Sequence, residues 1–375
     1  MTEQETLYSI ALSFVPRLNL LNRKLLLEKM GSATEIFEQR QHLKEIIPHA
    51  NPSTLEALAM MDIHLKRAEE ELAFAKAGHI QCLGFYDEEY PARLRECPDA
   101  PILLYYRGNT SLNSQHIISM VGTRQITPYG KDLCHTFVKE LKKLCPDVLI
   151  VSGLAYGVDI QCHRAALEQG MDTVGVLAHG LDQIYPRMHR DTAVQMVLHG
   201  GLLTEFPSRS NADKKNFVQR NRIVAGMADA TIVVESAKKG GSLITAEITE
   251  GYGRDVFAFP GRIGDIYSEG CNMLIKDNHA GLITCAEDFV KAMGWETEAQ
   301  LHQQLSQGLQ QELFPDLTEE EQRIVKALAG TDSKQINILA VDTALPMGRL
   351  TSLLFNLEMK GIVRLLSGGC YRLAK

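Results

Sequence analysis

Six short apolar runs, separated by longer segments with helical spacing, dominate the middle of the chain. They are His116–Val121, Val148–Val151, Thr173–Ala178, Thr231–Glu235, Asp255–Phe259 and Gly281–Thr284. This alternation predicts an α/β fold with a doubly wound parallel sheet, in which each run is a strand. Ligands of such sheets bind beyond the carboxyl ends of the strands, so the residues that follow each strand are the first candidates for a functional site.

Helical spacing also marks the first part of the chain. Apolar residues recur at helical intervals from Leu7 to Leu72, which predicts a small helical domain over residues 1–75. The α/β domain, together with the segment that leads into it, is then expected over residues 76–295. Two domains before residue 300 agree with the chain length, since 375 residues exceed what one hydrophobic core usually organises.

Residues 318–375 predict a third domain, of winged-helix type. A capping box at 318–321 begins a helix that is expected to end near Ala329, and further helices are expected over Ile336–Ala340 and Pro346–Lys360. A β-hairpin then forms the wing. The third helix carries few cations, which favours protein docking or a structural role over binding of duplex DNA.

The formal net charge of −7 is concentrated in one segment. Trp295 to Glu321 contains seven acidic residues and no Lys or Arg, so the rest of the chain is formally neutral. Residues 296–317 are also rich in Gln and lack an apolar stripe, which predicts an interdomain linker. Local basic patches determine polyanion binding, so the overall acidity does not exclude a nucleic-acid ligand.

Composition predicts a soluble, cytoplasmic protein without a membrane partner. No apolar run reaches membrane-spanning length, and no charged segment followed by an apolar one opens the chain. The cysteines contain no C-x-x-C pair, which favours reduced, packed thiols over a zinc or redox site. These cysteines are Cys82, Cys97, Cys134, Cys145, Cys162, Cys271, Cys285 and Cys370.

Glycine-containing turns follow the first two predicted strands. In the turn at 122–124, Gly122 permits close backbone approach, Thr123 offers a hydroxyl and Arg124 offers a forked donor. The second turn, Ser-Gly-Leu-Ala-Tyr-Gly at 152–157, differs from the dinucleotide fingerprint G-x-G-x-x-G, and the next strand ends without an acidic residue. NAD is therefore disfavoured, and neither a cofactor nor a metal is expected.

A basic segment precedes the predicted strand at 231–235. Five cations lie within fourteen residues against a single acid, Asp213, and they are Arg209, Lys214, Lys215, Arg220 and Arg222. Polar donors stand between them, and Phe217 is either a core residue or a ring that stacks a base. A solvated basic face is the simplest interpretation. Cations interleaved with polar donors and a ring are, however, typical of sites for single-stranded nucleic acid.

A Gly-Gly-Ser turn follows the same strand and opens a helix. Lys238 adds charge there, and the segment 240–242 adds close backbone approach and free N–H groups at a helix N-terminus. Such a terminus is an anion site. Parallel topology brings the strand ends together, so the three turns and the basic segment are predicted to form one phosphate-binding pocket.

Polar residues after two other strands have a structural interpretation. Asp182 and Glu205 are acid–base candidates, but without an adjacent nucleophile we favour hydrogen bonds that hold loops. His163, His179 and His189 lack metal-ligand spacing, and we expect each to be a hydrogen-bonded structural residue.

An ordered set of motifs resembles the DNA-processing protein A (DprA/Smf) family. The motifs are Val-Gly-Thr-Arg at 121–124, Ser-Gly-Leu-Ala-Tyr-Gly-Val-Asp at 152–159, Gly-Leu-Asp-Gln-Ile-Tyr-Pro at 180–186, Arg-Asn-Arg-Ile at 220–223, Gly-Gly-Ser-Leu-Ile-Thr-Ala at 240–246, Pro-Gly at 260–261 and Gly-Cys-Asn-Met-Leu-Ile at 270–275. The resemblance implies an extended Rossmann-like core, a sterile-alpha-motif-like (SAM-like) N-terminal domain and a winged helix. It also implies a homodimer without catalytic activity that binds and protects single-stranded DNA and helps load the RecA recombinase in natural transformation.

By position, the resemblance assigns DNA contact to the first turn and to the basic segment. Residues 122–124 match the family's Gly-Ser-Arg turn, with Thr123 keeping the hydroxyl, and residues 220–222 match its basic helix. Gln219 stands where Lys or Arg is common, and Tyr156 where Arg is frequent. Each departure removes a phosphate contact, which predicts a shallower salt dependence, by about 0.7 per phosphate.

The complete expected DNA-binding set combines these turns and the basic segment. It consists of Gly122, Thr123, Arg124, Gly153, Lys214, Lys215, Phe217, Gln219, Arg220, Asn221, Arg222, Lys238, Gly240, Gly241 and Ser242. Alanine at Arg124 or at Arg220 is expected to weaken binding and to flatten the salt dependence by roughly 0.7, at similar thermal stability.

A second class of function stays open. Nucleotide-processing enzymes of the phosphoribohydrolase type also carry Gly-Gly turns on Rossmann-like sheets, and here Glu247 lies just beyond the Gly-Gly-Ser turn. In that reading Glu247 and Asp182 are catalytic. A mononucleotide needs one or two cations rather than five, so the basic segment favours a nucleic-acid strand.

Overall fold

The computed structural model describes residues 1–47, 51–295, 317–328, 333–360, 362–366 and 369–373. The chain divides into two compact units, Met1–Gln303 and Gln304–Lys375. The predicted linker, residues 296–317, lies outside the described residues apart from Leu317.

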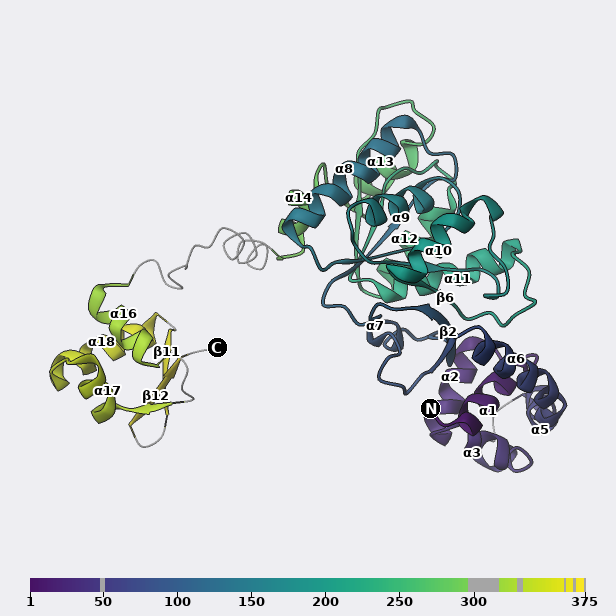
Figure 1. The fold of residues 1–375 in the computed structure, drawn as a ribbon, viewed down its shortest axis with the longest axis horizontal. Helices are drawn as coiled ribbons and strands as arrows, with labels where there is room; N and C mark the ends of the chain where they lie inside the picture. Colours follow the sequence, from purple (N-terminus) through teal and green to yellow (C-terminus); the bar gives the residue numbers. More distant parts are fainter. Residues whose placement is uncertain (48–50, 296–316, 329–332, 361, 367–368, 374–375) are drawn as a thin grey trace. The chain divides into compact units, whose positions relative to one another are not determined.

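The larger unit is built on a mixed sheet in which most strands run parallel (Figure 1). Within the described residues its strand order is β1-β2-β6-β5-β4-β3-β7-β8-β9. The strands are β1 (Gln81–Gly84), β2 (Leu103–Gly108), β3 (Ile117–Val121), β4 (Leu149–Ser152), β5 (Thr173–Val176), β6 (Gly200–Thr204), β7 (Ala230–Val233), β8 (Asp255–Ala258) and β9 (Gly281–Leu282). Every pair from β6 to β9 is parallel, whereas β2 is antiparallel to both β1 and β6.

All six predicted strands are confirmed, as β3, β4, β5, β7, β8 and β9. Strands β1, β2 and β6 are not among the six apolar runs, although a strand was expected to end before Glu205, where β6 ends. Strand β6 opens with Gly200-Gly201, a pair that disfavours strands, and β2 lies in a segment that was predicted only to connect two domains. Because β2 runs antiparallel, the sheet is mixed at this edge rather than uniformly parallel.

Helices cover both faces of the sheet, as doubly wound topology requires. They are α7 (Ala92–Arg95), α8 (Pro128–Leu144), α9 (Val158–Glu168), α10 (Arg190–Leu198), α11 (Lys214–Met227), α12 (Gly241–Gly251), α13 (Glu269–Lys276) and α14 (Ala286–Ala292). Alternate residues of β3 enter different cores: Ile118 and Met120 pack with α8, α9 and α14, while Ile117 and Val121 pack in the core that contains α11 and α12.

The N-terminal segment is helical, as its spacing predicted. Its α-helices are α1 (Glu3–Phe14), α2 (Leu20–Met30), α3 (Ala33–Glu38), α4 (Leu43–Ile46), α5 (Pro52–Ala59) and α6 (Leu65–Ala77), with a 3₁₀ turn, η1, over Met61–His64. Their buried residues join one hydrophobic cluster with those of β1 and β2. A buried carboxylate adds a polar connection, because Glu71 accepts hydrogen bonds from the Ser208 amide (2.7 Å) and hydroxyl (2.5 Å).

In its described part, the smaller unit has three helices and a sheet of order β10-β12-β11. Its elements are α16 (Glu319–Leu328), β10 (Lys334–Gln335), α17 (Ile336–Thr343), α18 (Met347–Met359), β11 (Val363–Leu366) and β12 (Cys370–Leu373). The predicted capping box is confirmed, since the Glu321 amide donates to the Thr318 hydroxyl (3.3 Å) and the Thr318 amide to the Glu321 carboxylate (2.8 Å).

The three histidines of interest are hydrogen-bonded inside the larger unit, as predicted. The Nδ1 atom of His163 lies 2.7 Å from the Thr173 hydroxyl, and that of His189 lies 2.9 Å from the Leu154 carbonyl. His179 Nε2 accepts from the Tyr185 amide at 3.2 Å. None of the eight cysteines is in a disulfide. Burial raises the pKa of several of these thiols above the usual range, that of Cys97 to about 11.

No single helix in the described part of the chain is long and apolar enough to span a bilayer. Helices α17 and α18 meet the length and composition criteria only as a pair, with a bend of 106° between them.

Candidate nucleic-acid interface

The first turn lies directly beyond β3 and is held by backbone contacts. The Thr123 amide donates to the Glu235 carbonyl (2.7 Å) and the Val158 amide donates to the Thr123 carbonyl (3.1 Å). A Cβ atom at Gly122 would lie 2.4 Å from Val158 Cγ2, so only glycine fits this close approach. Arg124, next along the turn, is exposed.

The second turn joins β4 to α9 and packs against the first. Gly157 has a φ of 78°, and a Cβ there would lie 2.0 Å from the Thr123 carbonyl oxygen. Gly153 is equally confined, since its Cβ would lie 2.5 Å from both Arg220 Nη2 and Asp159 Oδ2. Two glycines therefore allow the turns and the charged pair behind them to share one small volume.

Arg220 and Asp159 are both buried beneath the second turn, close enough for each to influence the pKa of the other. The Arg220 guanidinium donates to the carbonyls of Gly153 (2.6 Å) and Val176, at the ends of β4 and β5. Burial lowers the pKa of Arg220 to about 10, so its guanidinium remains protonated near neutral pH. Burial also raises the pKa of Asp159, against the opposing effect of Arg220. Arg220 thus supplies positive charge from beneath the pocket and joins two strand ends.

Helix α11 forms a wall of the site. Asp213 caps its N-terminus by accepting from the Asn216 amide at 2.8 Å. Lys214 is exposed in the first turn. Phe217, which the sequence marked as a core or base-stacking ring, is half-buried: the guanidinium carbons of Arg124 and Arg220 lie 4.6 and 5.8 Å from its ring centroid. The phenyl ring therefore packs against two guanidinium groups of its own chain.

Helix α12 contributes its N-terminus, with Gly240 as N-cap. The first amides of a helix have no intrahelical acceptors, and the helix dipole favours an anion there. The Ser242 hydroxyl donates to the Ser236 hydroxyl at 2.9 Å, which fixes the turn before the helix. Gly241 has open space around its missing Cβ.

These elements enclose a pocket of about 630 Å³ at the carboxyl ends of β3, β4 and β7. Most of the expected DNA-binding residues line it. They are Gly122, Thr123, Arg124, Gly153, Lys214, Phe217, Arg220, Asn221, Gly240, Gly241 and Ser242. Their convergence confirms that the turns and the basic helix form one pocket; DNA contact by each residue stays a prediction.

Four expected residues do not line this pocket. Arg222 is buried elsewhere and pairs with Glu205, while its guanidinium also donates to the Asp99 carbonyl. Lys238 lies beside α13, Lys215 is exposed on α11, and Gln219 is half-buried on the same helix. Successive helical residues point in different directions, so a run of cations is not a single charged face.

The carboxylates of the alternative enzymatic reading do not meet. Glu247 is exposed on α12 and does not line the 630 Å³ pocket, and Asp182 lines a different one. Asp182 accepts from the Arg209 amide at 3.0 Å, which is the loop-holding role predicted for it. Glu205 also has a structural partner in Arg222.

Several pocket residues escaped the sequence reasoning. Asp159 and Thr245 line the pocket although they were not among the expected contacts. Asp159 had a detectable signal, because it ends the glycine-turn motif at 152–159 and a buried arginine requires an anionic partner.

Comparisons with known proteins agree with this architecture. Residues 81–294 match the family model described as DNA recombination-mediator protein A, and residues 311–369 match the DprA winged helix domain. Protein Smf of Escherichia coli is 30% identical over 90% of this chain and 89% of its own length. DNA processing protein DprA of Bacillus subtilis is 37% identical over 59% of this chain and 74% of its own length.

Solved structures give the same result. The crystal structure of DprA from Streptococcus pneumoniae covers 78% of this chain and 98% of its own, with a TM-score of 0.64 and 30% identity. A structure of DNA processing protein A from Helicobacter pylori, described by its single-stranded DNA binding mode, covers 57% of this chain and 95% of its own, with a TM-score of 0.52 and 30% identity. The extended Rossmann-like sheet and the winged helix are thereby confirmed.

Proposed function

The chain belongs to the DNA recombination-mediator protein A family, and on that premise we propose that it is a cytoplasmic, non-enzymatic single-stranded DNA-binding protein. In this proposal it forms a homodimer, protects incoming DNA and helps load the RecA recombinase during natural transformation. RecA and the second copy of the chain are its protein partners, and it needs no cofactor or metal.

The proposal rests on one observation: hydrogen-bond donors converge at the mouth of the pocket, and the described lining has no exposed carboxylate there. Arg124 and Lys214 are exposed there, and no described residue forms an ion pair with either. Gly240, Gly241 and Ser242, at the start of α12, line the same pocket, and Arg220 adds charge from below. Phosphates satisfy such donors, and a strand's backbone offers several phosphates in series.

The nature of the strand is supported from two sides. The solved Helicobacter pylori relative is described as binding single-stranded DNA. In this chain, the pocket is lined mainly by backbone turns, cations and a phenyl ring rather than by a protruding helix that fits a groove. Single strands are bound by such combinations of charge and rings.

A titration of fluorescent oligothymidine against salt tests the proposal. We expect Arg124→Ala to weaken binding and to make the log–log salt slope shallower by about 0.7, since one phosphate contact is lost. Lys139→Ala is the matched control, because Lys139 is an exposed cation on α8 outside the pocket and its loss should leave the slope unchanged.

Two outcomes contradict the proposal. An Arg124→Ala slope equal to that of wild type would place the DNA elsewhere on the molecule. Release of free base from nucleoside monophosphates, abolished by Glu247→Gln, would instead support a phosphoribohydrolase. Loading is tested separately, by whether wild-type protein, unlike Arg124→Ala, accelerates assembly of RecA on oligothymidine.

A further inference from the structure

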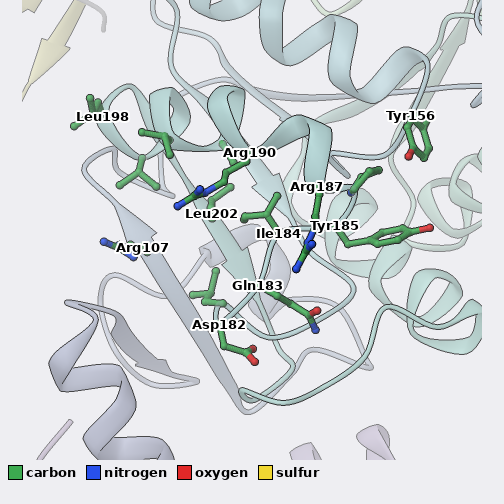
Figure 2. A pocket seen from close by; sticks show the side chains of 15 residues that line it. Arg107, Tyr156, Asp182, Gln183, Ile184, Tyr185, Arg187, Arg190, Leu198 and Leu202 are labelled. Atoms are coloured by element: carbon green, nitrogen blue, oxygen red, sulfur yellow. The ribbon is translucent and has the colours of Figure 1, made fainter.

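A second and larger pocket, of about 1310 Å³, lies beside the first in the same unit. It is bordered by the β4–α9 turn, the segment that follows β5, and helix α10 with strands β2 and β6. Figure 2 shows Tyr156 and Tyr185 on one side, Arg107 and Leu198 on the opposite side, and Arg190 between them.

The charge of this pocket is predominantly positive. Arg107, Arg187 and Arg190 line it and are exposed, and no described carboxylate forms an ion pair with any of them. Asp182 is the acidic residue of the lining, and it accepts a hydrogen bond from the Arg209 amide. Three guanidinium groups without anionic partners point to an anionic ligand.

Two tyrosine rings distinguish this pocket from a simple phosphate site. Tyr156 and Tyr185 are 41% and 45% exposed, so a large part of each side chain is open to solvent. Tyr156 packs on His189 with ring centroids 5.2 Å apart and an interplanar angle of 70°. Phe217, by contrast, is half-buried under two guanidinium groups, so the tyrosines offer the more accessible stacking surfaces.

The two pockets are neighbours, and aromatic rings lie between them. Tyr185 meets Phe217 of the first pocket in a T-shaped contact with centroids 6.0 Å apart. Tyr156 belongs to the turn whose other residues, Gly153 and Ala155, line the first pocket. The tyrosines therefore border the first pocket on the side of the second one.

We propose that this pocket is a second subsite for single-stranded nucleic acid, in which bases stack on Tyr156 and Tyr185 while Arg187 and Arg190 hold the phosphates. This proposal rests on the proposed function, because the strand that enters the second pocket is also bound in the first. Rings between cations are the arrangement that binds single strands independently of sequence. Tyr156 stands where the family frequently has Arg, so it lacks that phosphate contact. In this subsite it provides a stacking contact instead.

An acidic peptide is the competing ligand, since Val194 and Leu198 form an apolar wall at the far end of the pocket. The contact of Tyr185 with Phe217 of the first pocket, and the place of Tyr156 in the β4–α9 turn, favour nucleic acid. The peptide becomes the conclusion if DNA binding proves independent of the tyrosines and arginines.

The test compares two lengths of fluorescent oligothymidine, of about 5 and about 20 nucleotides, on the full-length protein, because single-strand sites on one fold cover about 4–16 nucleotides. We expect Tyr185→Leu to weaken binding of the longer strand about fivefold or more, since one stacked base contributes roughly that factor. Arg190→Gln should also weaken binding of the longer strand, since it removes a phosphate contact. The shorter strand should bind within about twofold of wild type, because the first pocket holds it.

Controls separate the subsite from the fold and from the first pocket. Tyr185→Phe keeps the ring and should restore binding of the longer strand, and Lys139→Gln removes an exposed charge outside both pockets. Arg124→Ala should weaken both lengths. The second subsite alone is overturned if Arg124→Ala loses affinity while Tyr185→Leu and Arg190→Gln bind the longer strand as wild type does. If the wild-type protein binds neither strand, the proposed function is overturned as well.

Photocrosslinking gives an independent readout that does not need a substitution. Oligothymidine carrying 5-iododeoxyuridine is irradiated with the full-length protein, and the crosslinked peptides are mapped by mass spectrometry. Crosslinks at Tyr156 or Tyr185 support the subsite, whereas crosslinks confined to Phe217 contradict it.

Discussion

Arg220 serves both the fold and the candidate site. Its guanidinium donates to the carbonyls of Gly153 and Val176 and lies beside the buried Asp159 carboxylate, yet it also lines the phosphate pocket. Sequence reasoning treated it as equivalent to Arg124, with loss of DNA affinity at similar stability. The structure separates them, because Arg124 is exposed and Arg220 is 3% exposed.

Arg220→Ala is therefore expected to reduce stability as well as DNA binding. Removing the guanidinium leaves Asp159 buried without its cation, which costs about 3–5 kcal/mol in the free energy of unfolding. Arg124→Ala should change that free energy by no more than about 0.5 kcal/mol, as exposed substitutions usually do. Urea denaturation measures both, and equal midpoints for wild type and Arg220→Ala would contradict the structural role.

Gly153→Ala tests how closely the second turn approaches this charged pair. The added Cβ would lie 2.5 Å from Arg220 Nη2 and Asp159 Oδ2, so the buried pair must move. We expect a loss of about 1–3 kcal/mol, as in other overpacked sites. Gly241→Ala is the control from the same pocket, because its Cβ meets nothing within 4 Å. Comparable losses for both variants would show that the clash is not the cause.

At the scale of elements, α9 and β5 are joined by a polar contact that depends on pH. The Thr173 hydroxyl donates to the Ile150 carbonyl (2.8 Å), so it accepts from His163 Nδ1, and the imidazole is neutral. Its Nε2 atom is buried and has no partner among the described residues. Protonation would place an unpaired N–H there, and burial accordingly lowers the pKa of His163 to about 3.

Acid is expected to destabilise the larger unit through this histidine. In the unfolded chain the imidazole titrates near its usual pKa of about 6.5, so between pH 6.5 and 3 the unfolded state binds the extra proton. Stability falls as pH decreases through this window, by up to about tenfold in the folding equilibrium constant per pH unit. Urea titrations of wild type and His163→Gln at pH 7 and 5 measure it: the variant should lose less stability on acidification, and parallel losses would contradict the assignment.

The strands also differ in how readily the sequence pattern predicts them. Strands β3, β4 and β7 are continuous apolar runs buried on both faces, and such runs are detectable without knowing their neighbours. Strand β6 begins with two glycines, which disfavour strands in general. Here the neighbouring strand leaves no room for a side chain, since a Cβ at Gly201 would lie 2.3 Å from the Tyr106 ring on β2. That reason exists only in the folded sheet.

At the scale of the whole molecule, the chain contains two compact units with separate hydrophobic cores. The smaller unit buries Leu350, Leu354 and Leu357 of α18 against α16 and α17. The larger unit has its own clusters on the two faces of the sheet. Compact units that each have their own hydrophobic core are expected to unfold as separate cooperative units.

Calorimetry of the full chain is expected to show two transitions. Leu354→Ala, at a fully buried site of the smaller unit, should cost that unit about 2–5 kcal/mol and lower one transition only. Leu104→Ala, fully buried in β2, should lower the other. A single transition that shifts with either substitution would show that the two units unfold together.

The sequence by itself determined the succession of strands and helices, the family and the turns that build the pocket, because each depends on residues close together in the chain. Periodicity and glycine placement are local properties. The tertiary structure decided which of the five neighbouring cations reach the pocket: Lys214 and Arg220 line it, whereas Arg222 turns to Glu205. Those choices depend on contacts between residues far apart in the chain, which no local pattern records.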